Sequence, residues 1–181
     1  MDAYRYVDPG PTPPASSAAT AKVMRRTGRR DTGPELRLRK TLHRRGLRFL
    51  VDAPFPGGNK RRRVDILLRG PRIAVFVDGC FWHSCPEHGL LPKSNREWWR
   101  RKLEGVVRRD RDTDAELTTA GWLVVRVWEH EDPETTAELI ERCPASRKWL
   151  SLARLMLVSI DLVDGHRWVD EARGPRGGGC G

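Results

Sequence analysis

The stretch that decides the fold reads Ile73-Ala-Val-Phe-Val-Asp-Gly-Cys-Phe-Trp-His83-Ser-Cys-Pro-Glu-His88. Its first five residues form an unbroken apolar run, which is typical of a strand buried on both faces. An aspartate follows directly, and two cysteines, two histidines and two aromatic residues follow within ten positions. The stretch therefore predicts a central strand whose carboxyl end carries a dense set of chemically active side chains.

The residues before this stretch predict a hairpin. Residues 64–68 are a second strand-like run, and Gly70-Pro71 stands between the two runs. Gly-Pro pairs mark turns, because glycine supplies backbone freedom and proline fixes φ. We therefore expect the two strands to pair antiparallel.

The residues after the stretch predict a crossover. Ser94 and Glu97 have the capping-box spacing, in which each side chain satisfies a backbone donor of the other residue. The long helix that they open is expected to end before Gly121, and residues 122–128 form the next strand. A strand, a helix and a strand in this order favour parallel pairing.

Two outer helices and one more strand complete the domain. The segment Asp31-Thr-Gly-Pro34-Glu35 predicts a helix start, and Gly46 predicts its end. Residues 47–51 are expected to form a strand, and Asp132-Pro133-Glu134 to start a last helix that Pro144 closes. The order α-β-β-β-α-β-α predicts an α/β fold with a mixed central sheet flanked by helices.

Composition divides the 181 residues into three parts, of which one has a core. Residues 1–21 are rich in Pro, Ala, Ser and Thr, which predicts a flexible N-terminal arm. Residues 22–143 are the expected folded domain. Residues 144–181 are a C-terminal extension, with an apolar run at 149–158 that favours a helix and a glycine-rich tail expected to be disordered.

Charge points to nucleic acid as the partner. The chain has 34 Lys+Arg against 24 Asp+Glu, and residues 22–63 alone hold fifteen basic residues against three acids. Such clustering favours polyanions. No apolar stretch approaches the roughly 20 residues of a membrane span, and no signal-peptide pattern is visible at the N-terminus, so we expect a cytoplasmic protein without a membrane partner.

The four cysteines then favour metal ligation over disulfides, because a cytoplasmic protein keeps its thiols reduced. Cys80, Cys85 and His88 supply three donors on one short loop, which suits tetrahedral Zn²⁺. His130, just past the end of a central strand, is the preferred fourth ligand, and Cys143 and His83 are the alternatives. The competing interpretation is that both cysteines are small buried apolar residues and the histidines are surface groups.

Acids at strand ends predict a second site. Asp65 lies in the second strand and Asp78 at the end of the third, so a hairpin would bring them together, and Glu35 would add an outer carboxylate. Phosphodiester hydrolysis needs a hard cation held by such oxygens. The alternative is that these acids are exposed or paired with arginines. His83 is the natural proton-transfer group, unless it is a zinc ligand.

Aromatic residues gather beside both predicted sites. Phe81 and Trp82 share the loop of the proposed ligands, and Trp98-Trp99 open the long helix. Tryptophans usually belong to a core. In a basic setting, however, loop aromatics can wedge between base pairs or stack on an unpaired base.

The chain from about Ala21 to Cys143 resembles the very-short-patch-repair (Vsr) mismatch endonucleases. The most specific shared string is Gly79-Cys80-Phe81-Trp82-His83. The other shared motifs, in chain order, are Met24-Arg25, Arg30-Asp31-Thr32 followed by Glu35, Val64-Asp65, Trp99 with Arg109-Asp110 beyond it, Gly121-Trp122 and Val127-Trp128-Glu129.

This resemblance implies a restriction-endonuclease-like (PD-(D/E)xK type) fold, a structural Zn²⁺ and Mg²⁺-dependent strand nicking beside a T:G mismatch in double-stranded DNA. It also implies roles for individual residues. Asp65 would bind Mg²⁺ with the backbone carbonyl of Val77, and His83, Glu35 and Asp78 would complete the catalytic set. Zinc would be held by Cys80, Cys85, His88 and His130, and DNA would be contacted by Met24, Arg25, Arg30, Phe81, Trp82 and Trp99.

Three positions depart from the best-known pattern of the family. Asp78 replaces a second active-site histidine, so proton transfer does not carry over there and an added metal ligand is the alternative. Cys85 and His130 exchange their residue types, which preserves a zinc site. Val23 replaces an asparagine before Met24, in the region that would contact DNA.

The expected protein is a monomeric DNA nicking enzyme, with mismatch-repair proteins as candidate partners. Two alternatives stay open at this point. The first is a restriction-type nuclease that cuts matched or modified DNA. The second is a zinc-stabilised DNA-binding module without catalysis.

Overall fold

A computed structural model describes residues 8–18, 21–22, 28, 30–56 and 61–143 of the chain. The elements follow in the order α2 (Gly33–Arg44), β1 (Leu50–Pro54), β2 (Arg63–Leu68), β3 (Ile73–Asp78), α3 (Arg96–Thr119), β4 (Leu123–Trp128) and α4 (Pro133–Arg142). The four strands form one sheet in the order β1-β2-β3-β4, so β4, which was expected to be a central strand, lies at the edge of this sheet. The expected α/β order is thereby confirmed.

The sheet is mixed, as the hairpin and the crossover predict. β1 pairs antiparallel with β2, and β2 pairs antiparallel with β3. β3 and β4 are parallel over their whole length, from Ile73–Leu123 to Asp78–Trp128. The crossover through α3 therefore places the carboxyl ends of β3 and β4 side by side.

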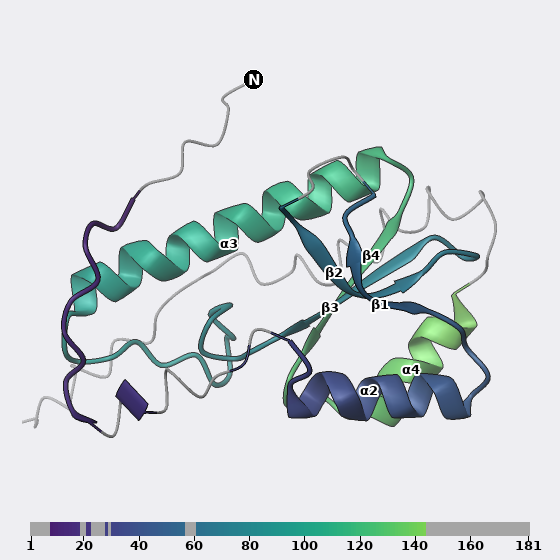
Figure 1. Cartoon of the computed structure of the whole chain (residues 1–181), viewed down its shortest axis with the longest axis horizontal. Helices are drawn as coiled ribbons and strands as arrows, with labels where there is room; N and C mark the ends of the chain where they lie inside the picture. Colours follow the sequence, from purple (N-terminus) through teal and green to yellow (C-terminus); the bar gives the residue numbers. More distant parts are fainter. Residues whose placement is uncertain (1–7, 19–20, 23–27, 29, 57–60, 144–181) are drawn as a thin grey trace, which may run out of the picture.

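Helices cover both faces of the sheet (Figure 1), with α2 and α4 on one side and α3 on the other. Alternate residues of β3 supply the two cores: Ile73 and Val75 pack with α2 and α4, and Ala74 and Phe76 pack with the C-terminal half of α3 at Leu117. Because every residue of β3 except Val77 is buried, this strand has no solvent-facing side.

The pleat of β2 breaks at Asp65. Val64 packs into the core beneath α3, whereas Ile66, two residues on, packs into the core beneath α2 and α4. In a regular strand, residues two apart share a face. The pairing of β2 with β3 extends only from Leu68–Ile73 to Ile66–Val75. Asp65 thus stands where the two strands separate.

Two local predictions were wrong. The strand expected at 47–51 is β1 at Leu50–Pro54, because Leu47 N–H instead bonds to Leu42 O and closes α2 around Gly46 (φ 82°). The capping box also fails. Asn95, with φ 54°, is the N-cap of α3, and Glu97 pairs with Arg100 and Arg101 rather than with the backbone.

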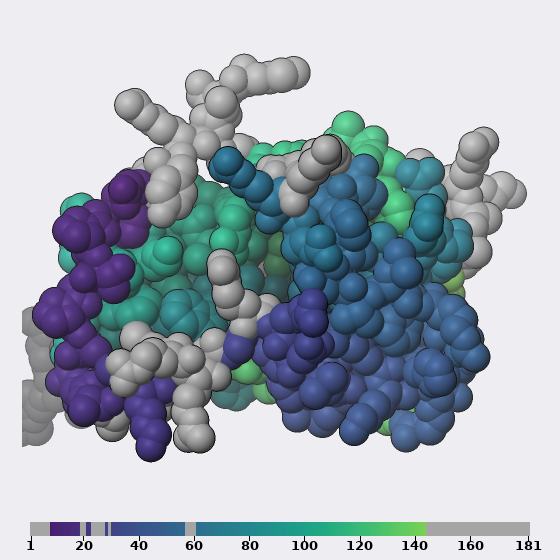
Figure 2. All heavy atoms as spheres, in the orientation of Figure 1, coloured from purple at the N-terminus to yellow at the C-terminus, as the bar shows by residue number. Residues whose placement is uncertain are grey.

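Residues 8–18 cross the start of α3 (Figure 2), where Trp98 Nε1–H donates to Gly10 O at 3.3 Å. The predicted C-terminal extension at 144–181 and its apolar run lie outside the described residues. Within the described ranges, no helix is both long and apolar enough to cross a bilayer.

Candidate active site and metal centre

Asp65 occupies the split between β2 and β3. Its Oδ2 accepts a hydrogen bond from Val77 N–H at 2.8 Å, which replaces a strand-to-strand bond at that point. Burial, together with the nearby charges of Glu35 and Asp78, raises the pKa of Asp65 to about 6. Such a carboxylate is costly to keep charged without a cation beside it.

Glu35 approaches the same place from the first turn of α2. The helix starts there because Pro34 suits an early position and the carboxylate of Glu35 accepts from Asp31 N–H and Thr32 Oγ1–H, both at 3.0 Å. Arg39, one turn on, donates to Glu35 Oε2 at 2.6 Å. Glu35 is therefore buried and held by Arg39, and its charge acts on Asp65; its role as an outer carboxylate stays a prediction.

Asp78 is also buried, but it has a different partner. Arg126 from β4 donates through Nη1 to both Asp78 oxygens, at 2.9 and 2.8 Å. This pairing follows from the parallel register, which sets Arg126 opposite Phe76 and close to the end of β3.

His83 lies beside these acids and is bound to a second one. Its Nδ1 is 2.7 Å from Asp110 Oδ2 and 3.4 Å from Asp78 Oδ1. Burial opposes a charge on the ring, but the hydrogen bond to Asp110 and the charges of both acids outweigh it, so the pKa of His83 lies above its usual value. The histidine is thus free of the Cys/His group, and its Nε2 is the nitrogen left for other chemistry.

Asp110 was present in the shared motifs, but no role was predicted for it. It lies in the middle of α3, on the face turned to the loop after β3. Burial alone would raise the pKa of this carboxyl, but contact with His83 and the charge of Arg126 hold it below its usual value. The sequence signal was weak because Asp110 stands in a run of alternating arginines and aspartates.

The four predicted zinc ligands converge. Cys80, Cys85, His88 and His130 offer ligand atoms that all lie within 4.8 Å of one another. Cys80 Sγ is 3.1 Å from His130 Nδ1, and Cys85 Sγ is 3.9 Å from His88 Nδ1. Neither alternative ligand belongs to the group: His83 binds Asp110, and Cys143 packs against the core beneath α2 and α4.

The Cys/His group is tied to the end of β4. Cys80 N–H donates to Glu129 Oε1 at 2.7 Å, and Gly79, one residue earlier, lies close to both Glu129 and Trp82. Burial and the neighbouring Cys85 raise the pKa of Cys80 to about 12. A cation bound to the two sulfur atoms would relieve that cost by stabilising the thiolates.

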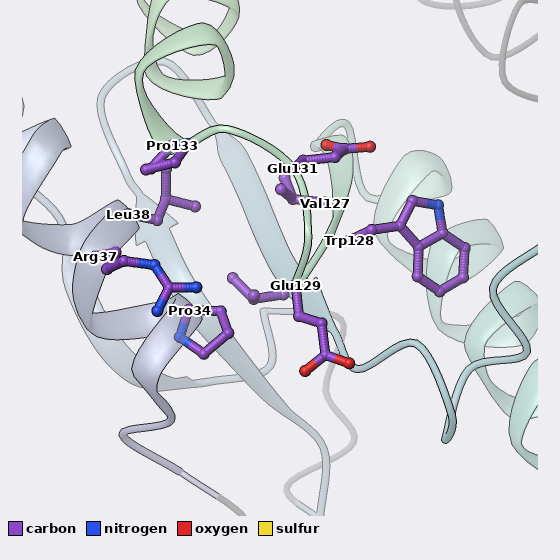
Figure 3. Close-up of a pocket in the computed structure, with 9 residues that line it drawn as sticks. Pro34, Arg37, Leu38, Val127, Trp128, Glu129, Glu131 and Pro133 are labelled. Atoms are coloured by element: carbon purple, nitrogen blue, oxygen red, sulfur yellow. The ribbon is translucent and has the colours of Figure 1, made fainter. Parts of the chain in front are cut away.

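A pocket lies between this end of β4 and the start of α2 (Figure 3). Pro34 and Arg37 come from the helix on one side, and Glu129 and Glu131 come from the segment after β4 on the other. Val77 also lines the pocket. The hollow therefore reaches the residue whose backbone holds Asp65.

The predicted aromatic residues form one cluster. Phe81 contacts Trp82 and Trp99 edge to face, with ring centroids 5.1 and 5.2 Å apart, and Trp98 packs on Trp99 at 4.9 Å. Trp99 is buried, whereas Phe81 and Trp82 are partly exposed. The cluster is therefore neither part of the two sheet cores nor fully open.

The basic segment 22–63 is partly neutralised. Arg30 pairs with Asp31 and Asp52, and Arg63 pairs with Asp52. Arg39, Arg44, Arg45 and Arg62 also form ion pairs with acids. Met24 and Arg25 lie outside the described residues.

Carboxylates that can hold a cation and a histidine–aspartate pair that can transfer a proton are groups that metal-assisted hydrolysis uses, and an aromatic cluster adjoins them. Comparison with known proteins agrees with this class. Residues 15–87 match the family model described as DNA mismatch endonuclease Vsr. The chain belongs to the Vsr family of DNA endonucleases.

Individual relatives extend the match beyond residue 87. The type II nicking enzyme V.NaeI of Lentzea aerocolonigenes is 41% identical over 124 residues, which cover 68% of this chain and 75% of that protein. The DNA mismatch endonuclease Vsr of Escherichia coli is 39% identical over 116 residues, 62% of this chain and 70% of that one. The type II nicking enzyme V.NmeDIP of Neisseria meningitidis is 32% identical over 135 residues, with 72% and 88% covered.

Proposed function

We propose that this enzyme nicks one strand of duplex DNA beside a T:G mismatch, in a Mg²⁺-dependent step of very-short-patch repair. The observation that carries the proposal is Asp65, a partly buried acid at the strand split whose ionised form is disfavoured by the charges of Glu35 and Asp78. The site favours a cation, because a cation would relieve the repulsion among these acids. The proposed fold type is the restriction-endonuclease-like PD-(D/E)xK type.

Asp65 would hold Mg²⁺, with the backbone carbonyl of Val77 as a further ligand. When bound, the metal ion polarises the phosphate and lowers the pKa of a water molecule. Glu35, held by Arg39, adds an outer carboxylate that can orient water. Asp78 is not proposed as a ligand, because both of its oxygens are already bound by Arg126.

His83 would transfer a proton through Nε2. Its Nδ1 lies 2.7 Å from Asp110 Oδ2, and this contact fixes the ring and leaves Nε2 available for proton transfer. The hydrogen bond to Asp110 and the charges of Asp78 and Asp110 raise the pKa of the ring above its usual value, which favours the imidazolium, the form that can donate a proton to the leaving oxygen. Asp110 balances the charge and orients the ring.

Cys80, Cys85, His88 and His130 would hold a structural Zn²⁺. In a tetrahedral site with Zn–S near 2.3 Å and Zn–N near 2.05 Å, sulfur and nitrogen ligands lie about 3.6 Å apart. The sulfur–nitrogen distances of 3.1, 3.9 and 4.0 Å bracket that value. Such an ion would fix the position of the loop that carries Phe81, Trp82 and His83.

The aromatic cluster would then meet the distorted base pair. Phe81, Trp82 and Trp99 lie on the loop and helix beside His83, so a base step wedged by them would place a neighbouring phosphate near the acids. Met24 would enter from the other groove, and Arg25 and Arg30 would contact phosphates. The enzyme is proposed to act as a cytoplasmic monomer, with mismatch-repair proteins as further partners.

A panel of duplexes tests this function. Each duplex has the same sequence and carries a T:G pair, another mismatch or none, and nicking is measured with Mg²⁺ present or absent. Selective nicking of the T:G duplex supports the proposal. Equal cutting of matched DNA would favour a restriction-type nuclease, and Mg²⁺-independent binding without a nicked product would favour a zinc-stabilised binding module.

A further inference from the structure

Arg126 is the centre of a partly buried charge network that the proposed chemistry does not use directly. Its Nη1 binds both oxygens of Asp78, and its Nε binds both oxygens of Asp114 at 3.1 and 3.0 Å. Its Nη2 lies 3.6 Å from Asp110 Oδ1, and its guanidinium carbon lies 4.8 Å from the centroid of the Phe76 ring. One side chain thus joins the end of β3 to two positions on α3.

Two of these three acids are the ones that hold His83. Asp110 Oδ2 contacts His83 Nδ1 at 2.7 Å while Asp110 Oδ1 faces Arg126. Asp78 Oδ1 lies 3.4 Å from the same nitrogen while both Asp78 oxygens bind Arg126. The orientation of the imidazole therefore depends on carboxylates whose own positions are set by one guanidinium.

The geometry suits arginine and no other residue. A planar guanidinium can bind two carboxylates in fixed directions at once, whereas a lysine ammonium is a single point charge on a flexible stem. Without a cation at this place, Asp78, Asp110 and Asp114 would face one another as three acids, and like charges repel. Their rearrangement would release the His83 ring.

We propose that Arg126 is a positioning residue for the nicking reaction: it fixes Asp78 and Asp110, and through them it holds the His83 ring with Nε2 turned toward the scissile phosphate. This inference rests on the proposed function for its effect on rate. It also assigns Asp78 the role of a bridge between Arg126 and His83, in place of the metal ligand that the sequence left open.

Arg62 supplies a matched control. It also reaches α3 from the sheet side, where it pairs with Asp112 and Glu116, and it lies over the Phe55 ring. Its side chain is 18% exposed, against 20% for Arg126. Arg62 contacts neither His83 nor the acids around it. Arg62→Met therefore measures the effect of losing an arginine that pairs with α3 without disturbing the surroundings of His83.

The test compares Arg126→Met, Arg126→Lys and Arg62→Met on a T:G duplex under single-turnover and steady-state conditions. A displaced catalytic group typically costs about 100-fold in rate. We expect Arg126→Met to lower kcat about 100-fold with KM within about threefold of the wild type, and Arg126→Lys to recover about tenfold of that loss. Arg62→Met should leave kcat within about threefold, and kcat alone is the control readout, because Arg62 belongs to the basic segment 22–63 and its loss can raise KM.

A second readout does not depend on activity. The chain has five histidines. The Nδ1 proton of His83, protected from solvent exchange by its hydrogen bond to Asp110, should give an NMR resonance that is absent in His83→Gln. We expect that resonance to disappear in Arg126→Met and to persist in Arg62→Met. Its persistence in folded Arg126→Met, or an unchanged kcat, would overturn the inference; failure of the wild type to nick any duplex would instead refute the proposed function.

Discussion

Replacing Asp65 with asparagine should stabilise the metal-free protein. Asparagine keeps an oxygen that can accept from Val77 N–H, so the hydrogen bond at the strand split is retained while the charge is lost. The wild-type carboxylate is partly buried, and its desolvation and the charges of Glu35 and Asp78 disfavour its ionised form. The substitution therefore removes an unfavourable charge without opening a cavity.

The size of the effect follows from the pKa of Asp65, which rises from 3.8 in the unfolded chain to about 6 in the fold. At about 1.36 kcal/mol per pKa unit, this corresponds to roughly 3 kcal/mol. A folded pKa above the unfolded one gives a contribution that is present below pH 3.8 and is lost as pH rises through 6. Asp65→Asn should therefore match the wild type near pH 4 and exceed it by up to about 3 kcal/mol at pH 8.

Urea unfolding at several pH values between 4 and 8, in buffer without Mg²⁺ and without chelators that would strip zinc, measures this difference. Asp52→Asn on the adjacent strand is the control. Arg63 binds Asp52 and lowers the pKa of this carboxyl, although burial acts in the opposite direction. Removing the charge of Asp52 should therefore give no gain in the free energy of unfolding at high pH. A difference between wild type and Asp65→Asn that stays constant across the range would refute the reasoning.

Two further predictions concern the Cys/His group and the basic segment. Stoichiometric zinc in the purified protein should be lost in Cys85→Ala and in His130→Ala but kept in Cys143→Ala, because Cys143 packs against the core; loss of zinc in Cys143→Ala would contradict the assigned ligands. If about six phosphates are contacted, the logarithm of DNA affinity should fall with the logarithm of salt concentration at a slope near roughly −5. A flat salt response would show that the basic segment is not the docking surface.

The central sheet was predictable because its strands and connections have patterns that can be recognised in the sequence alone. The apolar run of β3 and the turn at Gly70-Pro71 determine a buried strand and a hairpin. The long helix and Gly121 determine the crossover and its end. Such patterns are reliable because a strand buried on both faces requires an apolar side chain at nearly every position.

The errors arose at the ends of helices, where single backbone bonds decide the boundary. Leu47 looks like the first residue of a strand, yet its N–H completes the cap of α2. Ser94 and Glu97 have the spacing of a capping box, but the left-handed Asn95 shifts the start of α3 by one residue. Propensity is too weak to choose between such neighbouring registers.

The candidate site was predicted only as far as its residues stand near strand ends. The residues themselves indicated Asp65, His83 and the Cys/His ligands with alternatives left open, and the resemblance chose among these alternatives. The structure places the residues as two adjacent groups. Arg126 was missed because the role of an arginine within an apolar strand cannot be predicted until the acids that it pairs with are known. Those partners, Asp78 and Asp114, come from different elements and meet only in the fold.

The most direct test of the account is the nicking of a T:G duplex by the wild type and by Asp65→Ala in the presence of Mg²⁺, with the matched duplex beside it. Circular dichroism and zinc content establish that the variant is folded. The account predicts that the wild type nicks the T:G duplex selectively and that folded Asp65→Ala produces no nick. Retained nicking in Asp65→Ala would contradict the central claim that Asp65 anchors the catalytic metal.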